Sequence, residues 1–442
     1  MTNKKKRIYW FCFLLLPLLL IFVRPVTVPA QTRTLTLEQA IEIARERNRD
    51  IQKAGEYIAW AKGKYVEERA AAFPQVTATG FIVRDRDGSQ KIYGDAMADP
   101  ASRQSAQIVL TQPVFTWGRI GSAIRAADMG LKSADEQLRL YRQAVQRDVM
   151  AAFYDALLAR ELHGLALQDL AQKKRHLTEA QKKYAGGVAT DYDVLTAEVS
   201  VKNAGPQAIR TENAIRTAHD RLRVLLALDD DTIEASGSLT AAVSPVRTYQ
   251  EAISLAQARR PDLADMKCRV KMSRELVAVY AAQNKPRLDL KGIYGWNRID
   301  QGWDQGDGAV WSAGVYLTYP LFDGLGTRGR VAQAESDLRR LKLDEARLLQ
   351  SVCVEVREAL NAVNEADAII RALSGTVSQA ERLLGMAEQG FALGVKTRLD
   401  VEDAELNLQQ AQSNLSRARR DYLVARAHLD WVTGILGEES HE

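Results

Sequence analysis

The chain has 442 residues, enough for two or three ordinary domains or for one repeated architecture. Its formal net charge is only +4 and charges of both signs are mixed along it, which argues against the clustered basic surface of a nucleic-acid-binding protein. With 46% hydrophobic and 26% charged residues, it is neither disordered nor a bundle of membrane-spanning helices. Three cysteines without a CxxC pair and five histidines without an HExxH motif give no metal-binding pattern, so no cofactor is expected.

Residues 1–30 have the form of a secretory signal peptide. The basic segment Lys4–Arg7 precedes the apolar run Ile8–Val23, and small residues at Val28 and Ala30 mark a cleavage point before Gln31. The apolar run is shorter than the roughly 20 residues of a helical bilayer span, with an uncleaved anchor as the alternative. The mature chain is therefore expected to be exported.

The mature sequence is a tandem repeat. The pattern T-x-x-[QE]-A-I at residues 36–41 recurs at residues 248–253, and P-[VL]-F at residues 113–115 recurs at residues 320–322. Self-similarity of this kind indicates two structurally equivalent units. The expected division is a first repeat over residues 31–235, a linker over residues 236–247 and a second repeat over residues 248–442.

Each repeat shows the same order of elements. In the first, a capping box opens a helix over residues 37–72, which Pro74 ends. Two β-rich segments follow, and then a long helix with a seven-residue stripe of apolar and small residues, typical of close coiled-coil packing. The expected bounds are strands 76–83 and 106–115, long helix 118–184, tip 184–194 and last helix 190–228 in the first repeat, and strands 288–296 and 310–322, long helix 327–391 and tip 391–401 in the second.

The helix lengths constrain the shape of the molecule. A helix over residues 118–184 would span roughly 100 Å at about 1.5 Å per residue, which no compact globular domain accommodates. The first and last helices of the repeat, stacked end to end, match that length. We therefore expect a hairpin whose return limb is made of two stacked helices, with the linker near the point where they meet.

The predicted strands are suited to a membrane barrel. Each is about 9–11 residues long, the length of a tilted bilayer-spanning strand. Aromatic residues cluster there, including Trp117, Trp296, Trp303 and Trp311, as in the girdles of transmembrane barrels. A soluble four-stranded sheet packed on helices is the alternative, but the export signal and the long helices favour the barrel. Because about eight strands are needed for closure, the chain would have to form a dimer or a trimer.

Two tip sequences carry a family resemblance: YAGGVATDYDV at residues 184–194 and FALGVKTRLDV at residues 391–401. With the tandem repeat and the P-[VL]-F segments, they make the chain resemble the TolC-type outer-membrane efflux protein family over essentially its whole mature length. The resemblance implies a mainly α fold with a small β part. Long α-hairpins would form a trimeric periplasmic α-barrel, and four transmembrane β-strands per chain would contribute to one shared 12-stranded β-barrel.

The same resemblance implies a function and its partners. The protein would be the exit duct of a tripartite efflux pump or a type I secretion system and not an enzyme. It would meet a periplasmic adaptor, or membrane fusion protein, and an inner-membrane transporter of RND or ABC type. Its barrel would sit in outer-membrane lipid and most of its mass in the periplasm. The alternative is an exported periplasmic coiled-coil scaffold or adaptor without its own pore.

The tips can also be interpreted physically. In each, a glycine suits the left-handed position that ends a helix, and a threonine then caps the next helix with an aspartate three residues on. Exposed valines beside these glycines would form the adaptor contact at the end of the rod. The tip residues are Gly187, Val188, Thr190 and Asp193 in the first repeat and Gly394, Val395, Thr397 and Asp400 in the second.

By resemblance, Asp400 and Asp403 match the family's acidic ring at the periplasmic aperture. Residues three apart share a helix face, so both could point into the channel and favour cations. The family's closed latch uses an aromatic hydroxyl and a basic residue, at positions held here by Phe391 and Lys396. Phe391 has no hydroxyl and Lys396 replaces a bidentate arginine, so we expect the hydrogen-bonded latch with Asp193 to be weakened.

Overall fold

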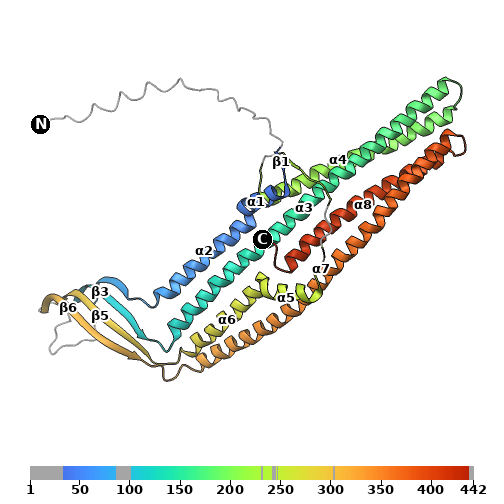
Figure 1. Cartoon of the computed structure of the whole chain (residues 1–442). Helices are drawn as coiled ribbons and strands as arrows, with labels where there is room; N and C mark the ends of the chain where they lie inside the picture. Colours follow the sequence, from blue (N-terminus) through green and yellow to red (C-terminus); the bar gives the residue numbers. More distant parts are fainter. Residues whose placement is uncertain are drawn as a thin grey trace, which may run out of the picture.

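The computed structural model describes residues 33–85, 101–229, 232–240, 245, 247–301 and 304–437. The expected signal peptide, most of the polar segment 84–105 and part of the linker lie outside the described residues. The described part is elongated, with a four-stranded sheet at one end, two hairpin tips at the other and helices running between them (Figure 1).

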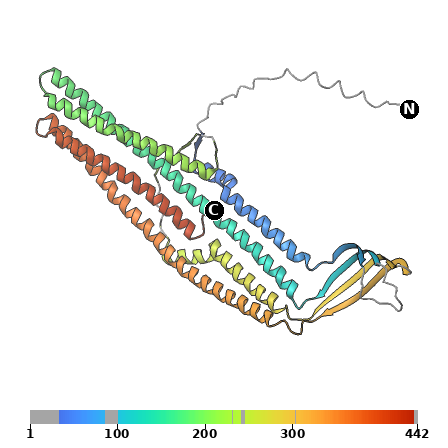
Figure 2. The same ribbon diagram turned by 180° about the vertical axis from the view of Figure 1, so that it is seen from behind.

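Two long helices form the frame of the molecule. Each has 67 residues and so is about 100 Å long at ~1.5 Å per residue. Shorter helices flank each of them, one toward the tip and a pair toward the sheet, as Figure 2 shows from behind. The bounds are α1 Leu37–Arg47, α2 Arg49–Ala70, α3 Arg119–Ala185, α4 Asp191–Leu226, α5 Tyr249–Arg259, α6 Pro261–Ala281, α7 Gly326–Ala392 and α8 Arg398–Val432.

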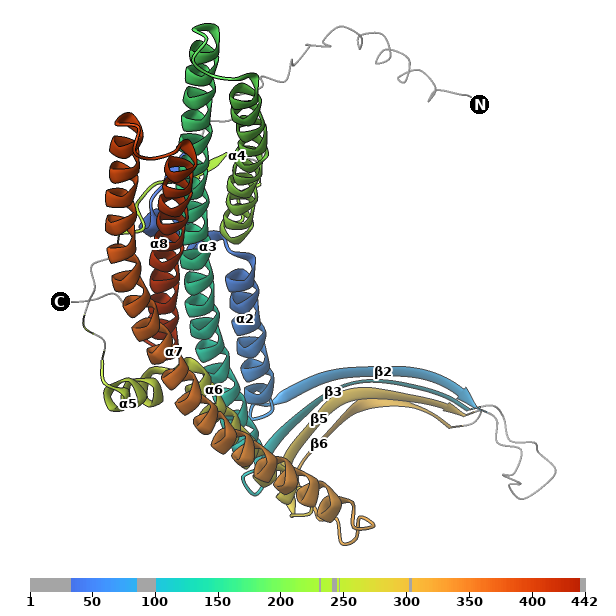
Figure 3. The same cartoon turned by 90° about the vertical axis from the view of Figure 1, so that its right-hand side faces the viewer.

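The helices lie side by side in one curved layer (Figure 3). In the half nearer the sheet the order across the layer is α2, α3, α6, α7, and in the half nearer the tips it is α4, α3, α8, α7. In the described chain, α2 and α4 therefore form one flank of the layer and α7 forms the other. The flanks matter because they are the surfaces at which another copy could continue the layer.

The helix predicted over residues 37–72 is two helices, and its prediction as one was wrong. The chain bends at Asn48, whose side-chain oxygen accepts hydrogen bonds from the backbone amides of Asp50 and Ile51 at 2.9 and 3.4 Å. The amide nitrogen of Asn48 donates to the carbonyl of Leu225 at 2.8 Å. The side-chain oxygen of asparagine is well suited to accept hydrogen bonds from the first backbone amides of a helix. Asn48 therefore begins α2 and does not continue α1. The second repeat bends at Pro261, which suits a first helical position because it has no amide hydrogen.

The bend between α5 and α6 is anchored by a buried arginine. Arg260 is 7% exposed, and its guanidinium donates to the carboxylates of Asp262 on α6 and Glu355 on α7, each at 2.7 Å. The Trp431 ring of α8 lies 5.8 Å from the same guanidinium and 4.3 Å from that of Arg147 on α3. One cluster of charges and one indole therefore join α3, α6, α7 and α8 near the middle of the rod.

The four-stranded sheet is antiparallel in the order β2, β3, β5, β6. Its bounds are β2 Gln75–Asp85, β3 Ala101–Phe115, β5 Arg287–Gln301 and β6 Asp304–Thr318. The strands extend beyond the predicted bounds 76–83, 106–115 and 288–296, because polar residues interpreted as loop continue the ladder, as the Arg103–Asp85 ion pair at 3.5 Å illustrates. The predicted end of strand 310–322 was too late in the sequence. β6 stops at Thr318, before Pro320, which has no amide hydrogen to donate to the strand ladder.

A second, two-stranded sheet was not expected. β1 (Arg33–Leu35) and β4 (Ile233–Ala235) pair in parallel and bring the start of the described chain to the linker at mid-length. Their side chains Leu35 and Ile233 join a core with Phe153 and Leu222, all at most 4% exposed. Strands of three residues are too short to produce a recognisable periodicity in the sequence.

Candidate functional site

The tip between α3 and α4 is closed by a left-handed glycine and a capping box. Gly187 has φ 74°, and the amide of Val188 donates to the carbonyl of Lys183 at 2.9 Å. Thr190 then begins α4: its amide donates to the Asp193 carboxylate at 2.8 Å, and its hydroxyl oxygen accepts from the Asp193 amide at 3.3 Å. The chain therefore reverses within a few residues with its end groups satisfied.

The tip between α7 and α8 repeats this geometry. Gly394 also has φ 74°, and the amide of Val395 donates to the carbonyl of Gly390 at 2.8 Å. The Thr397 amide donates to the Asp400 carboxylate at 2.8 Å, and the Thr397 hydroxyl accepts from the Asp400 amide at 3.2 Å. The two tips are therefore equivalent surfaces built by the two repeats.

Both capping aspartates have a pKa below the ordinary value of the residue. The pKa of Asp193 lies below its ordinary value, chiefly because the backbone amide of Thr190 donates to the carboxylate. The pKa of Asp400 is lowered in the same way by Thr397, with a further contribution from Lys396. Each tip therefore presents an ionised carboxylate at neutral pH, exposed at Asp193 and half-buried at Asp400.

The outermost side chains of both tips are apolar and exposed. Val188 is 82% exposed and Val395 is 79% exposed, because no residue of the described chain covers them. Asp403 is exposed on α8 one turn beyond Asp400, so the two carboxylates share a helix side. Each tip thus combines a rigid turn, an exposed valine and carboxylates nearby.

The residues at the latch positions form contacts other than a shared hydrogen bond. Lys396 places its Nζ 3.3 Å from Oδ1 of Asp400, within its own hairpin. Asp193 makes its hydrogen bonds to Thr190, also within its own hairpin. The Phe391 ring of α7 instead faces the Nζ of Lys183 on α3, 5.4 Å from the ring centroid, a cation–π contact between the two tips.

Further from the tips, α3 and α8 are joined by polar side chains that sequence reasoning missed. The Glu405 side chain of α8 is only 9% exposed, and its Oε1 lies 2.8 Å from Nε2 of His176 on α3. Gln172, one turn earlier on α3, donates to the same oxygen. Nearer the middle of the rod, Arg420 of α8 donates to Asp155 of α3 at 2.7 Å. No local pattern marks these residues, because each looks like an ordinary polar position of a coiled coil.

The register of the sheet determines which side chains share a face, since directly opposed residues project to the same side. On one face the central rows are apolar and uncovered in the described chain, with Ile82 79%, Trp311 75% and Leu317 69% exposed. The members of this apolar face are Val76, Ala78, Ile82, Ala106, Ile108, Leu110, Leu290, Tyr294, Trp296, Ala309, Trp311, Ala313, Val315 and Leu317. The opposite face carries polar side chains among apolar ones, including Thr77, Thr79, Ser105, Gln107, Lys291, Asn297 and Ser312.

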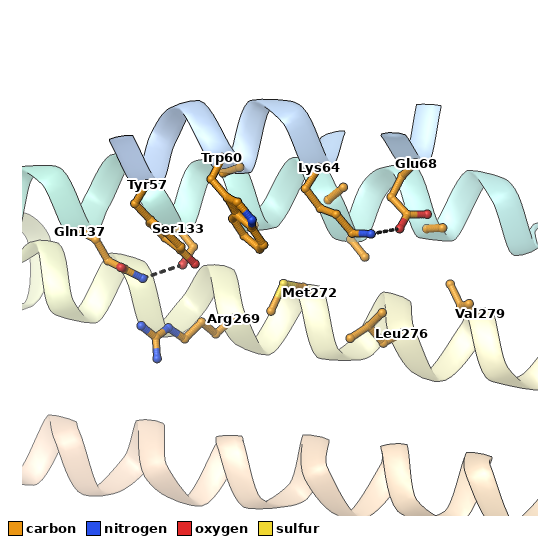
Figure 4. Close-up of a pocket in the computed structure, with 15 residues that line it drawn as sticks. Tyr57, Trp60, Lys64, Glu68, Ser133, Gln137, Arg269, Met272, Leu276 and Val279 are labelled. Atoms are coloured by element: carbon orange, nitrogen blue, oxygen red, sulfur yellow. Dashed lines mark hydrogen bonds and ion pairs between the residues drawn. The ribbon is translucent and has the colours of Figure 1, made fainter. Parts of the chain in front are cut away.

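A groove of about 570 Å³ lies along α2, α3 and α6 in the half nearer the sheet (Figure 4). Tyr57 and Trp60 project from α2 toward Met272 of α6, with their rings stacked at a centroid distance of 5.4 Å. At one end of the groove Lys64 is paired with Glu68 at 3.0 Å. The groove therefore offers an aromatic, largely apolar surface, and the charged side chains drawn at its end are already paired.

Two properties of the described residues bear on other classes of site. No helix in the described part of the chain is both long enough and apolar enough to cross a membrane. Among the same residues, no group of three or more His, Cys, Asp or Glu side chains is arranged to hold a metal ion.

Comparison with known proteins gives a consistent result. The family profile described as "Outer membrane efflux protein" matches residues 40–228 and 252–435. "Outer membrane protein TolC" of Vibrio cholerae is 25% identical over 385 residues, covering 84% of this chain and 87% of that protein. "Alkaline protease secretion protein AprF" of Pseudomonas aeruginosa is 26% identical over 417 residues, covering 91% of this chain and 82% of that protein.

A solved structure extends the likeness to the fold. The crystal structure of the Campylobacter jejuni CmeC outer membrane channel superposes with a TM-score of 0.79, over 92% of this chain and 87% of that one. Sequence identity is 16%, so this similarity is evidence for the fold alone.

Proposed function

The chain belongs to the outer membrane efflux protein family, and we propose that three copies of it together form the exit duct of a tripartite efflux pump or a type I secretion system. It is an outer-membrane channel protein and not an enzyme, in keeping with relatives named for outer-membrane efflux and for protease secretion. Substrates would enter at the tips and leave through the sheet end. A duct of this kind catalyses nothing, and the energy for transport would come from its partners.

The observation that carries the proposal is the exposed apolar face of the sheet. Along β6 it extends from Ala309 to Leu317, about 26 Å at ~3.3 Å per residue, close to the height of a barrel's lipid-facing band. Polar residues on the same face lie toward the ends of the strands: Arg298 and Asp307 at the far end, and Gln112 at the end nearer the helices. The apolar middle of this face suits the hydrocarbon core of a bilayer, and the polar residues beyond it suit the lipid head groups.

The edges of the sheet support assembly into a closed barrel. Open edges are not tolerated in lipid, and β2 and β6 each have a partner on one side only in the described chain. The two edge strands run in opposite directions, so β6 of one copy can pair antiparallel with β2 of the next. Three copies would supply twelve strands, above the roughly eight needed to close a barrel.

The flanks of the helix layer support the same ring. On α4, exposed apolar residues recur at coiled-coil spacing at Tyr192, Leu195 and Val199. On α7, Leu383 and Met386 are exposed at the matching level near the tips. Packing α4 of one copy against α7 of the next would bury both stripes and continue the layer into an α-barrel.

We place adaptor docking at the tips, through Gly187, Val188 and Thr190 of one and Gly394, Val395 and Thr397 of the other. Rigid turns with exposed valines suit a protein contact because little conformational entropy is lost on binding. Val188→Asp should therefore weaken cross-linking to the periplasmic adaptor. Val224→Asp, at a site 75% exposed on α4 but far from the tip, is the matched control and should leave cross-linking unchanged.

We place the periplasmic aperture at the same end, lined by Asp400 and Asp403 with Asp193, Lys396 and Phe391 close by. Ionised carboxylates around a narrow opening would attract cations. Replacing Asp400 and Asp403 by asparagine should lower the cation selectivity of the channel in a planar bilayer. Selectivity unchanged in that double variant would remove both residues from the aperture.

The first experiment is the mass of the membrane-extracted protein in mild detergent, corrected for bound detergent. A trimer is the expected result and agrees with a shared barrel of twelve strands. A monomer that stays soluble without detergent would refute the barrel, because the apolar face of the sheet could not then lie in lipid. It would favour a periplasmic coiled-coil scaffold instead.

A further inference from the structure

The groove along α2, α3 and α6 exists because the middle helix carries only small side chains at its floor. Residues three and four apart lie on one side of a helix, so the floor is a single stripe of α3. A Cβ at Gly130 would lie 3.6 Å from Sδ of Met272 on α6, so the missing side chain leaves room there. The floor residues are Ala123, Ala126, Ala127, Gly130 and Ser133.

The second repeat has large charged side chains at the equivalent positions. Counted from the P-[VL]-F segment of each repeat, Gly130 of α3 corresponds to Asp337 of α7. In the same way Ser133 corresponds to Arg340. Asp337 and Arg340 are exposed and pair with each other at 3.3 Å. The hollow floor is therefore a feature of the first repeat and not a by-product of the duplicated architecture.

One wall of the groove is a preformed aromatic surface. The rings of Tyr57 and Trp60 on α2 are stacked with their planes 10° apart, and these residues are 42% and 62% exposed. Met272 and Leu276 of α6 form the opposite wall (Figure 4). A volume of about 570 Å³ suits a small molecule, since such sites occupy roughly 300–1,000 Å³. Aromatic faces attract cations, so the wall favours a ligand that is both apolar and positively charged.

The charges around the groove favour the same kind of ligand. Arg269 of α6 is paired with Asp265 at 2.8 Å. Nζ of Lys64 lies 3.0 Å from a carboxylate oxygen of Glu67 and 3.0 Å from one of Glu68. Counted with their partners, these basic groups leave one negative charge uncompensated. An anion would meet basic groups that are already paired, whereas a cation would meet the surplus carboxylate.

We propose that this groove is a binding site for an amphiphilic organic cation. Its apolar body would lie on the floor of α3, between the Tyr57–Trp60 pair and Met272, and its charge would be balanced by the carboxylates beside Lys64. All lining residues belong to one copy, so the inference goes beyond the proposed duct function and does not depend on it. In an assembled duct, the site would hold such cations in the half of the helix layer nearer the sheet.

The test is equilibrium dialysis of tetraphenylphosphonium against the membrane-extracted, full-length protein in neutral detergent, corrected for uptake by detergent alone. Tetraphenylborate has the same shape and the opposite charge, so it is the control for charge. The phosphonium ion should bind saturably and at least about tenfold more tightly than the borate ion. Equal affinity for the two ions, or no saturable binding of the phosphonium ion, would overturn the site.

A matched pair of variants locates the binding. Gly130→Leu should fill the floor and weaken phosphonium binding by about tenfold or more, as expected when an apolar body loses its place. Gly164→Leu makes the same change elsewhere on α3, where an added Cβ has no neighbour within 4 Å, and should leave binding unchanged. Both replace glycine by a better helix former, so neither should destabilise α3. Equal affinity of the two variants would overturn the site.

Two further variants keep the proposal falsifiable if Gly130→Leu fails to fold. Trp60→Ala should weaken phosphonium binding about tenfold. If it instead dissociates the assembly and leaves the affinity unchanged, Trp60 packs against a neighbouring copy and the site is overturned. Changing Glu67 and Glu68 to glutamine should reduce the preference for phosphonium over borate, and an unchanged preference would overturn the assignment to cations.

The site and the duct can fail separately. A monomeric protein that binds the phosphonium ion at this groove would remove the duct and support the site. A trimer without saturable binding would overturn the site alone.

Discussion

Introducing an arginine at Ala313 should test the membrane placement of the sheet. Ala313 lies in the middle of the apolar stretch of β6 between Ala309 and Leu317, opposite Gly292. It is about 13 Å from either end at ~3.3 Å per residue, so an arginine there would sit at the bilayer midplane. Because the side chain removed is a single methyl group, the effect measured is that of the charge.

The expected cost follows from the depth of the site. An arginine on the lipid face at the midplane destabilises a barrel by about 2–4 kcal/mol, and three copies in one barrel would each bear this cost. The neighbouring Ser312 projects from the opposite face of the same strand, so Ser312→Arg is the matched control. Facing the lumen, it should change the unfolding free energy by no more than about 0.5 kcal/mol.

The assay is urea unfolding of the protein in lipid vesicles, followed by tryptophan fluorescence, with heat-modifiable mobility on gels as a check of assembly. Ala313→Arg should lower the urea midpoint or prevent insertion, while Ser312→Arg should insert and unfold like the unmodified protein. Similar effects of the two substitutions, or a larger effect of Ser312→Arg, would refute the assignment of this face to lipid. Both faces would then have to lie in water or against protein.

Three further predictions concern other parts of the chain. Gly295→Val should block barrel assembly, measured by loss of the trimer in detergent, because a Cβ at Gly295 would lie 2.5 Å from the carbonyl oxygen of Ala106 on β3. Normal assembly would contradict the close approach of β3 and β5 at this position. Phe153→Ala should destabilise the mid-rod core by about 3–5 kcal/mol, measured by thermal unfolding of the helices, since Phe153 is 2% exposed. The pKa of Asp193 is lowered chiefly by the Thr190 amide. The contribution of this cap to the stability of α4 should therefore be present above the ordinary aspartate pKa and be lost as the pH falls through the lower pKa of the folded state. Hydrogen exchange in the first turn of α4, corrected for intrinsic rates, should show this loss. Asp193→Ala should remove the pH dependence.

The long helices were predictable because their periodicity is sustained. A seven-residue stripe along a helix of 67 residues, about 18 turns at 3.6 residues per turn, cannot be mistaken for a strand, and its length alone excludes a compact domain. The tips were predictable for a different reason: glycine, threonine and aspartate at fixed spacing have one well-defined capping geometry. Gly187, Thr190 and Asp193 show it, and the second repeat shows it again.

Local ambiguity explains the features that could not be predicted. Asn48 sits within a helical pattern and could have been a solvated position. In the structure its side-chain oxygen caps the first amides of α2, while its amide nitrogen is held by the carbonyl of Leu225, far along the chain. The outer ends of the strands are polar because they lie beyond the apolar band, so composition alone makes them look like loops. In both cases the deciding partner lies on another element.

The seam between the hairpins is the extreme case of this dependence on distant partners. Glu405 and His176 are 229 residues apart, in different repeats, and the equivalent positions of the two repeats do not face each other. The repeat pattern predicts the packing within each hairpin, because both hairpins share that pattern. It does not predict the contact between the two hairpins, which occurs once per copy. Duplication supplies two stiff hairpins, whereas the polar contacts that join them must be specific to each chain.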